Sequence, residues 1–110
     1  MFKVFASAAL LVAGLASAAP AQADQWDFIS NLDSRGVYYT DIFEMINTGK
    51  KICATIRNNP TKSSLDALFL SLTRVEGFAP TEGAIIVTAA ARHMCPDIWP
   101  AVQRWRDSGE

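Results

Sequence analysis

Residues 41–60, DIFEMINTGKKICATIRNNP, show the clearest helical pattern in the chain and contain one of its two cysteines. Asp41 followed by Glu44 is typical of an acidic capping pair at the start of a helix, and Asn58-Asn59 before Pro60 ends the helix. Between these ends the apolar residues recur at helical spacing rather than alternately. This stripe comprises Ile42, Ile46, Gly49, Cys53 and Ile56. The stretch therefore predicts one amphipathic helix with a glycine and a cysteine on its buried side.

Gly49 needs a physical reason inside this helix, because a glycine there costs about 1 kcal/mol relative to alanine. It lies one turn before Cys53 on the same face. The missing side chain would let a neighbouring backbone approach closely, and Ala84, Ala90 and Ala91 are candidates for the facing surface. The alternative hypothesis is that Gly49 breaks the helix into two.

Three more segments show helical spacing, and turn residues separate them. They are residues 24–36, residues 61–77 and residues 80–94, the last either capped by Thr81 or beginning at Pro80. The apolar residues expected on their buried sides are Phe28, Ile29 and Leu32, then Leu65, Leu68, Phe69, Leu72 and Val75, then Ala84, Val87, Ala90, Ala91 and Met94.

Only Val37-Tyr38-Tyr39 suggests a strand, and three residues are too few to form one. A short fifth helix from Pro100 is a further candidate, with Ile98, Val102 and Trp105 on one side. We therefore predict an all-α fold, a small disulfide-stapled bundle of four helices with this short C-terminal helix as a candidate fifth. The predicted domains are a helical domain over residues 24–96 and a tail over residues 97–110.

Residues 1–23 have the three parts of a secretory signal peptide. Lys3 stands near the start, an apolar run extends from Val4 to Ala19, and Ala21-Gln22-Ala23 fits the cleavage rule. The alternative is a membrane anchor, but the run is short and polar or small residues interrupt it. We expect cleavage after Ala23, a secreted or extracytoplasmic mature protein, and no membrane span in the mature chain.

In an exported chain, two cysteines are most simply explained by a disulfide. Cys53 lies on the buried stripe and Cys95 ends the last of the four helical segments, 42 positions away. The competing hypothesis is redox or nucleophilic chemistry. It requires a C-x-x-C motif or an electropositive setting for a thiol, and the sequence has neither around these residues.

Composition excludes several classes of function. The chain has 110 residues, which is enough for one small domain, and 10 Lys+Arg against 11 Asp+Glu. A net charge of -1 provides no basic field for nucleic acid. One histidine and two cysteines cannot form the usual four-ligand zinc sites alone. We expect neither a metal nor an organic cofactor.

His93 is the one side chain of its type and the natural general base. A catalytic triad would need Ser71 or Asp97 to converge on it, and nothing in the sequence supports either. The carboxylate pairs Asp24/Asp27 and Asp41/Glu44 stand at helix starts, where acidic residues are expected for capping. Charge is also uneven, since the front half is acidic and the last part is rich in arginine, at Arg92, Arg104 and Arg106.

Five aromatic residues lie near segment ends, outside the aliphatic stripes: Trp26, Tyr38, Tyr39, Trp99 and Trp105. In one interpretation the chain ends fold over the helices, and these rings cover the core. In the other they form an interface with a partner, because Trp and Tyr are favoured anchors of interfaces.

Several spaced motifs resemble an exported mycobacterial family called domain of unknown function seven-three-two, between Asp27 and Pro96. They are Phe28-x-x-x-Leu32-x-x-x-Gly36-Val37, Ile46-x-x-Gly49-x-x-x-Cys53, and Ala84-x-x-Val87-x-x-Ala90 leading to Cys95-Pro96. The resemblance implies a small secreted helical domain with a signal peptide and a Cys53–Cys95 bridge, and no known activity, cofactor or catalytic residue. Met94 replaces an aromatic residue common in the family, and Asn58-Asn59-Pro60 replaces a more usual glycine.

Three hypotheses of function follow. The leading one is a secreted, non-enzymatic interaction or binding module for an unidentified protein. The second is a carrier of a small apolar ligand, in a cavity lined by residues such as Phe69, Leu72 and Val87. The third is a hydrolytic enzyme that uses His93.

Overall fold

The computed structural model describes residues 25–108, and every regular element in that part of the chain is a helix. The first helix covers residues 25–34. The elements that follow are α2 (Ile42–Asn58), α3 (Lys62–Leu70), a π-helical turn η1 (Ser71–Val75), α4 (Pro80–His93), a 3-10 turn η2 (Pro96–Ile98) and α5 (Trp99–Ser108). The all-α prediction and its C-terminal helix are therefore confirmed. The predicted signal peptide, residues 1–23, lies outside the described residues.

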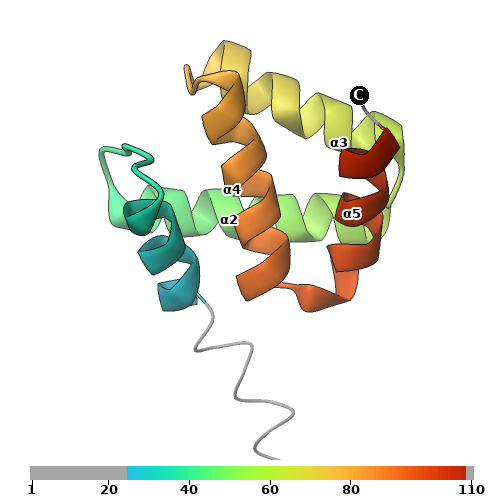
Figure 1. Cartoon of the computed structure of the whole chain (residues 1–110), viewed down its shortest axis with the longest axis horizontal. Coiled ribbons are helices and arrows are strands. Elements are labelled where there is room, and N and C mark those ends of the chain that lie inside the picture. Colours follow the sequence, from blue (N-terminus) through green and yellow to red (C-terminus); the bar gives the residue numbers. More distant parts are fainter. Residues whose placement is uncertain (1–24, 109–110) are drawn as a thin grey trace, which may run out of the picture.

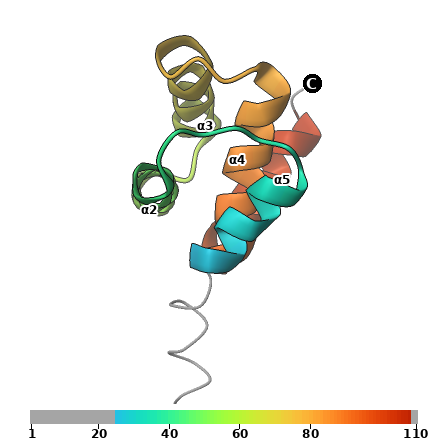
Figure 2. The same ribbon diagram turned by 90° about the vertical axis from the view of Figure 1, so that its left-hand side faces the viewer.

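The helices cross one another. In Figure 1, α2 and α3 run across the view, whereas α4 and α5 run up and down, and α2 passes behind α4. The finer prediction of a four-helix bundle is not confirmed by this arrangement. Figure 2 shows the first helix in front of α4, with the loop after it running back toward the start of α2.

The start of α2 shows the capping that its sequence predicts, whereas the start of α4 follows only one of the two predicted alternatives. The Asp41 side chain accepts hydrogen bonds from the backbone N–H groups of Phe43 and Glu44 at 2.8 and 3.1 Å. Thr61 caps α3. Capping of α4 by Thr81 is wrong, and the alternative start at Pro80 is correct, with Glu82 accepting a hydrogen bond from the Ala79 N–H. Proline suits this first position because its missing N–H would have no helical partner there.

The first helix ends in a left-handed turn at Gly36. The φ of Gly36 is 76°, a conformation that glycine adopts without a steric penalty. The Gly36 N–H donates to the Asp33 carbonyl and the Val37 N–H donates to the Leu32 carbonyl, which together form a Schellman motif. Val37 is buried, so the turn sends the chain back toward the core and on to α2.

One hydrophobic core connects all the helices. Its largest fully buried side chains are Phe28, Leu32, Ile52, Ile56, Leu65, Ile86, Val87 and Val102. On α4 the core face is largely alanine, because Ala89, Ala90 and Ala91 are all buried. Small side chains on α4 leave room for the larger ones of the crossing helix α2.

Two residues expected on buried stripes are exposed. Ile42 is 41% exposed at the first position of α2, where Met45 and Ile52 occupy the core face instead. Val75 is 80% exposed because residues 71–75 form a π-helix. The wider π turn adds a residue relative to the α-helical period and rotates Val75 away from the core side.

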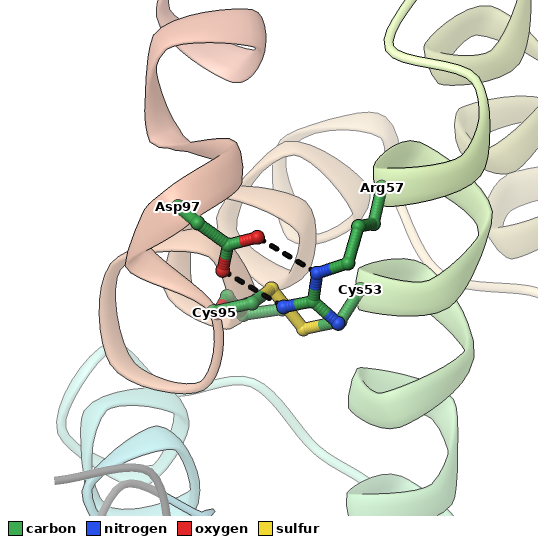
Figure 3. Close-up of polar contacts among 5 residues, drawn as sticks. Cys53, Arg57, Cys95 and Asp97 are labelled. Carbon is green, nitrogen blue, oxygen red and sulfur yellow. Dashed lines mark hydrogen bonds and ion pairs between the residues drawn. A yellow bond between two sulfur atoms is a disulfide. The ribbon is translucent and has the colours of Figure 1, made fainter. Parts of the chain in front are cut away.

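A disulfide joins Cys53, in the middle of α2, to Cys95, just after α4, with their Cα atoms 5.9 Å apart. One turn later on α2, Arg57 forms a two-pronged ion pair with Asp97, at 2.7 and 2.8 Å (Figure 3). The Arg57 guanidinium lowers the pKa of the Asp97 carboxyl, chiefly through these hydrogen bonds. A covalent link and a charged link therefore hold the same two segments together.

Helix α2 is continuous through Gly49, so the alternative of a helix broken in two is wrong. A Cβ atom on Gly49 would lie 2.5 Å from the Met94 sulfur and 3.0 Å from the Phe28 ring. The side chains of Phe28 and Met94, rather than the alanines of α4, are therefore the closest neighbours. Glycine is needed there because two large side chains fill the space beside it.

Replacing Gly49 by alanine is expected to destabilise the protein by about 1 kcal/mol, although alanine is the better helix former. The Met94 side chain is half-buried and can shift, but the Phe28 ring is fully buried and cannot move away freely. Urea denaturation measures the difference. Asn47→Ala, at an exposed position of the same helix, is the matched control and should be neutral or slightly stabilising. A Gly49→Ala variant as stable as Asn47→Ala would contradict the close packing.

Replacing Asp97 by asparagine is expected to cost about 0.5 kcal/mol at neutral pH, because both partners of the ion pair are about half exposed. The lowered pKa of Asp97 means that this stability is present above the carboxyl's ordinary pKa. It is lost as the pH falls through the lower folded-state pKa. Urea denaturation should therefore separate the variant from the parent at neutral pH, and this difference should shrink as the pH falls below the ordinary pKa of the carboxyl. Asp107→Asn, at an exposed position of α5, is the control, and an equal effect there would refute a specific pair.

Candidate functional site

The five aromatic residues proposed for an interface occupy different environments. Trp26 and Tyr38 are exposed. Tyr39, Trp99 and Trp105 are half-buried and pack against the core. The packing interpretation therefore fits these last three residues. Of the five, Trp26, which is 50% exposed, and Tyr38, which is 74% exposed, remain open to a partner.

Trp105 connects α5 to α3 through a hydrogen bond and an aromatic contact. Its indole N–H donates a hydrogen bond to Asp66 at 2.9 Å, and its ring centroid lies 6.0 Å from that of Phe69. Asp66 also accepts from Lys62 at 2.9 Å. Lys62 and then Trp105 lower the pKa of the Asp66 carboxyl. Removal of this ring would therefore disturb the fold as well as any interface.

An open groove of about 380 Å³ lies where three segments of chain meet. The loop before α2, the first turns of α2 and the loop before α4 supply its lining, which comprises Tyr38, Tyr39, Thr40, Asp41, Glu44, Met45, Thr48, Glu76, Gly77 and Phe78. We call this the acidic groove, because Asp41, Glu44 and Glu76 are its charged residues. Met45 is buried and belongs also to the core.

Local hydrogen bonds fix one wall of the acidic groove. The Tyr39 hydroxyl donates to Asp33 at 2.6 Å, which ties the loop before α2 to the first helix. This hydrogen bond is the main cause that raises the pKa of Tyr39 to about 12. Asp41 uses its carboxylate as the cap of α2. Glu44 and Glu76, in contrast, form no ion pair with any residue from 25 to 108.

Exposed apolar side chains belong to the same segments. Tyr38 is 74% exposed and Phe43 is 69% exposed, and both lie in the stretch that enters α2. Val75, directly before Glu76, is the most exposed of the large hydrophobic residues. Phe43 was not among the predicted site residues, although its place outside the apolar stripe was a usable signal. Val75 was assigned to the core, because an α-helical period cannot reveal a π turn.

The residues considered for catalysis do not come together. His93 is half-buried at the last turn of α4. Asp97 pairs with Arg57, and Ser71 caps the end of α3 with its backbone N–H. Among the described residues, no three His, Cys, Asp or Glu side chains are grouped to hold a metal ion. Asp24 lies outside the described part of the chain.

The residues suggested for an apolar ligand cavity belong largely to the packed interior. Leu72 and Val87 are buried members of the core. Phe69 lies against Trp105 and lines an open surface depression with Lys62 and Asp66. In the segment from residue 25 to residue 108, no helix is both long enough and apolar enough to cross a membrane.

Comparisons with known proteins place the chain in a family. Searches of curated proteins and of solved structures find no match. Residues 20–97 match the family model described as "Protein of unknown function (DUF732)". The match includes the resemblance from Asp27 to Pro96 and both cysteines, and covers well over half of the 110 residues. This chain therefore belongs to the DUF732 family of proteins of unknown function.

Proposed function

We propose that this protein is an exported, non-enzymatic binding module. In this proposal the acidic groove receives a segment of a partner protein that carries basic and apolar side chains. The observation that supports it most strongly is that exposed apolar side chains share short segments with Glu44 and Glu76, which form no ion pair with any residue from 25 to 108. Export is supported by the signal-peptide pattern of residues 1–23 and by the disulfide, which is typical of oxidising compartments.

The aromatic part of the groove would supply most of the binding energy. Large exposed rings are typical anchors of interfaces, because each can bury a large area with few rotatable bonds. Tyr38 is such a ring in the lining of the groove, and Phe43 lies in the same stretch of chain, outside the lining. The Tyr39–Asp33 hydrogen bond and the buried Met45 hold the groove in place before a partner arrives. A wall that is already ordered reduces the entropy cost of binding.

The carboxylates would select the partner by charge. Glu44 belongs to α2 and Glu76 to the loop before α4, and both line the groove. Their negative potential would attract a lysine or arginine side chain and repel an acidic segment. A partner segment with a basic residue beside a large apolar one fits both features.

Selection from a random peptide library displayed on phage, with the purified protein as bait, tests this proposal. Enriched peptides are expected to carry Lys or Arg next to a large apolar residue. Tyr38→Ala should lower the affinity for the tightest-binding peptide about tenfold, because it removes an aromatic anchor of the interface. The double variant Glu44→Gln/Glu76→Gln should also weaken it, and added salt should reduce this difference.

Trp26→Ala is the matched control, because Trp26 is an exposed aromatic residue that does not line the groove. Its binding should equal that of the parent protein, and thermal melting of each variant checks that the fold is retained. Peptides without a charge preference, or an equal loss with Trp26→Ala, would refute the acidic groove as the binding site.

A further inference from the structure

A second open pocket, of about 390 Å³, lies between the first helix, α4 and α5. Asn31 and Arg35 come from the first helix and the turn after it, Thr88, Arg92 and His93 from α4, and Arg106 from α5. All of these side chains can donate hydrogen bonds. No carboxylate is among the described residues that line the pocket. We call it the cationic pocket.

The positive charge of the cationic pocket is notable in a chain whose net charge is -1. Three of the ten Lys and Arg residues line it. The ion pairs found between residues 25 and 108 use Arg57 and Lys62, and neither of these lines the pocket. Each of the three arginines lies near the C-terminal end of its own helix, which suits the helix dipole. The dipole does not explain why arginines from three separate elements meet in one pocket.

Trp99 brings two of these guanidinium groups to one ring. The Arg92 Cζ atom lies 5.1 Å from the centroid of the Trp99 ring, and the Arg106 Cζ atom lies 6.0 Å from it. Each cation is attracted by the ring, but the two cations repel each other. An anion between them would remove this repulsion. Trp99 is half-buried against the core, so its ring is a firm support.

We propose that the cationic pocket binds a small oxyanion with two or more negative charges, of the phosphate-ester class. The planar guanidinium group presents paired N–H donors that match phosphate oxygens, and this bidentate geometry makes arginine the preferred residue for such ligands. The Thr88 hydroxyl and the Asn31 amide supply neutral donors beside the charges. Arg92, Arg106 and Arg35 bind the anion, and Trp99 is a positioning residue for the first two. The ligand class and the pocket are distinct from those of the acidic groove, so each proposal can fail without the other.

Titration of the oxidised protein with inorganic pyrophosphate, followed by two-dimensional 1H–15N NMR at constant ionic strength, tests the proposal. Saturable shifts are expected at the amides of Arg35, Thr88, Arg92 and Arg106 and at the indole N–H of Trp99, with a Kd of about 1 mM or lower. Acetate at the same ionic strength should not reproduce them, because it carries a single charge. Non-saturable shifts, or equal shifts with acetate, would refute the site.

Substitutions of single arginines show which side chains bind the anion. Arg92→Gln and Arg106→Gln should each weaken the binding of pyrophosphate about tenfold, since each removes a charge-assisted contact. Arg104→Gln is the matched control, because Arg104 is an exposed arginine of α5 that does not line the cationic pocket. It should change the affinity less than twofold. An equal loss with Arg104→Gln would show a general charge effect and would overturn the assignment.

Trp99 is tested by substitutions that leave the charge unchanged. Trp99→Leu should weaken binding about fivefold, and Trp99→Tyr should restore most of the affinity, because tyrosine also attracts cations. Thermal melting identifies any Trp99 variant that fails to fold. In that case the arginine substitutions test whether the pocket binds the anion. Equal affinity of the folded leucine and tyrosine variants would refute the positioning role.

A second experiment tests whether the phosphate group belongs to a soluble ligand or to a lipid headgroup. The protein is mixed with vesicles of phosphatidylcholine and phosphatidylglycerol, and the vesicles are sedimented. The protein should stay in solution, and the vesicles should not compete with pyrophosphate for the pocket. Arg92-dependent binding to these vesicles, displaced by pyrophosphate, would assign the pocket to a membrane headgroup and overturn the soluble ligand.

Discussion

The disulfide between Cys53 and Cys95 fixes where α4 lies against α2, and the other helices pack around this pair. It ties the middle of α2 to Cys95, just after the end of α4 (Figure 3). Gly49, one turn before Cys53, leaves the space that Phe28 and Met94 fill. The Arg57–Asp97 pair holds the same segments at the surface. Once α4 is fixed in this way, the first helix and α5 can pack beside it, and the cationic pocket lies between all three.

A small domain needs such a link because its core supplies little net stability. Much of the buried face of α4 is alanine, which buries less apolar area than leucine or isoleucine. The chain compensates with connections that do not depend on core volume. They are a covalent bond between α2 and the segment after α4, and aromatic and hydrogen-bonded contacts that Trp105 makes with α3. Three of the five aromatic side chains at the segment ends therefore serve the fold, which leaves Tyr38 and Trp26 as the exposed ones.

Helix positions, the disulfide and the C-terminal helix could be predicted from the sequence because each depends on local spacing or on the count of cysteines. The cap of α2 at Asp41 was also predicted correctly. The exposure of Val75 could not be predicted, because the π turn that contains it changes the helical period, and the pattern of apolar residues does not reveal this turn. The two candidate sites were also hidden. Arg35, Arg92 and Arg106 belong to three elements, and only the packing of these elements brings the charges together. The sequence showed that the last part of the chain is rich in arginine, but it could not show that Arg92 and Arg106 line one pocket with Arg35.

The most direct test of this account compares the free energy of unfolding of the oxidised protein with that of the double variant Cys53→Ala/Cys95→Ala, both measured by urea denaturation. Closing a loop with a sequence separation of 42 restricts the unfolded chain, and the chain-entropy relation gives a stabilisation of about 4 kcal/mol. We therefore expect the variant to lose about that amount, or to be unfolded without denaturant. A variant whose free energy of unfolding stays within about 1 kcal/mol of the oxidised protein would contradict the central role of this bond.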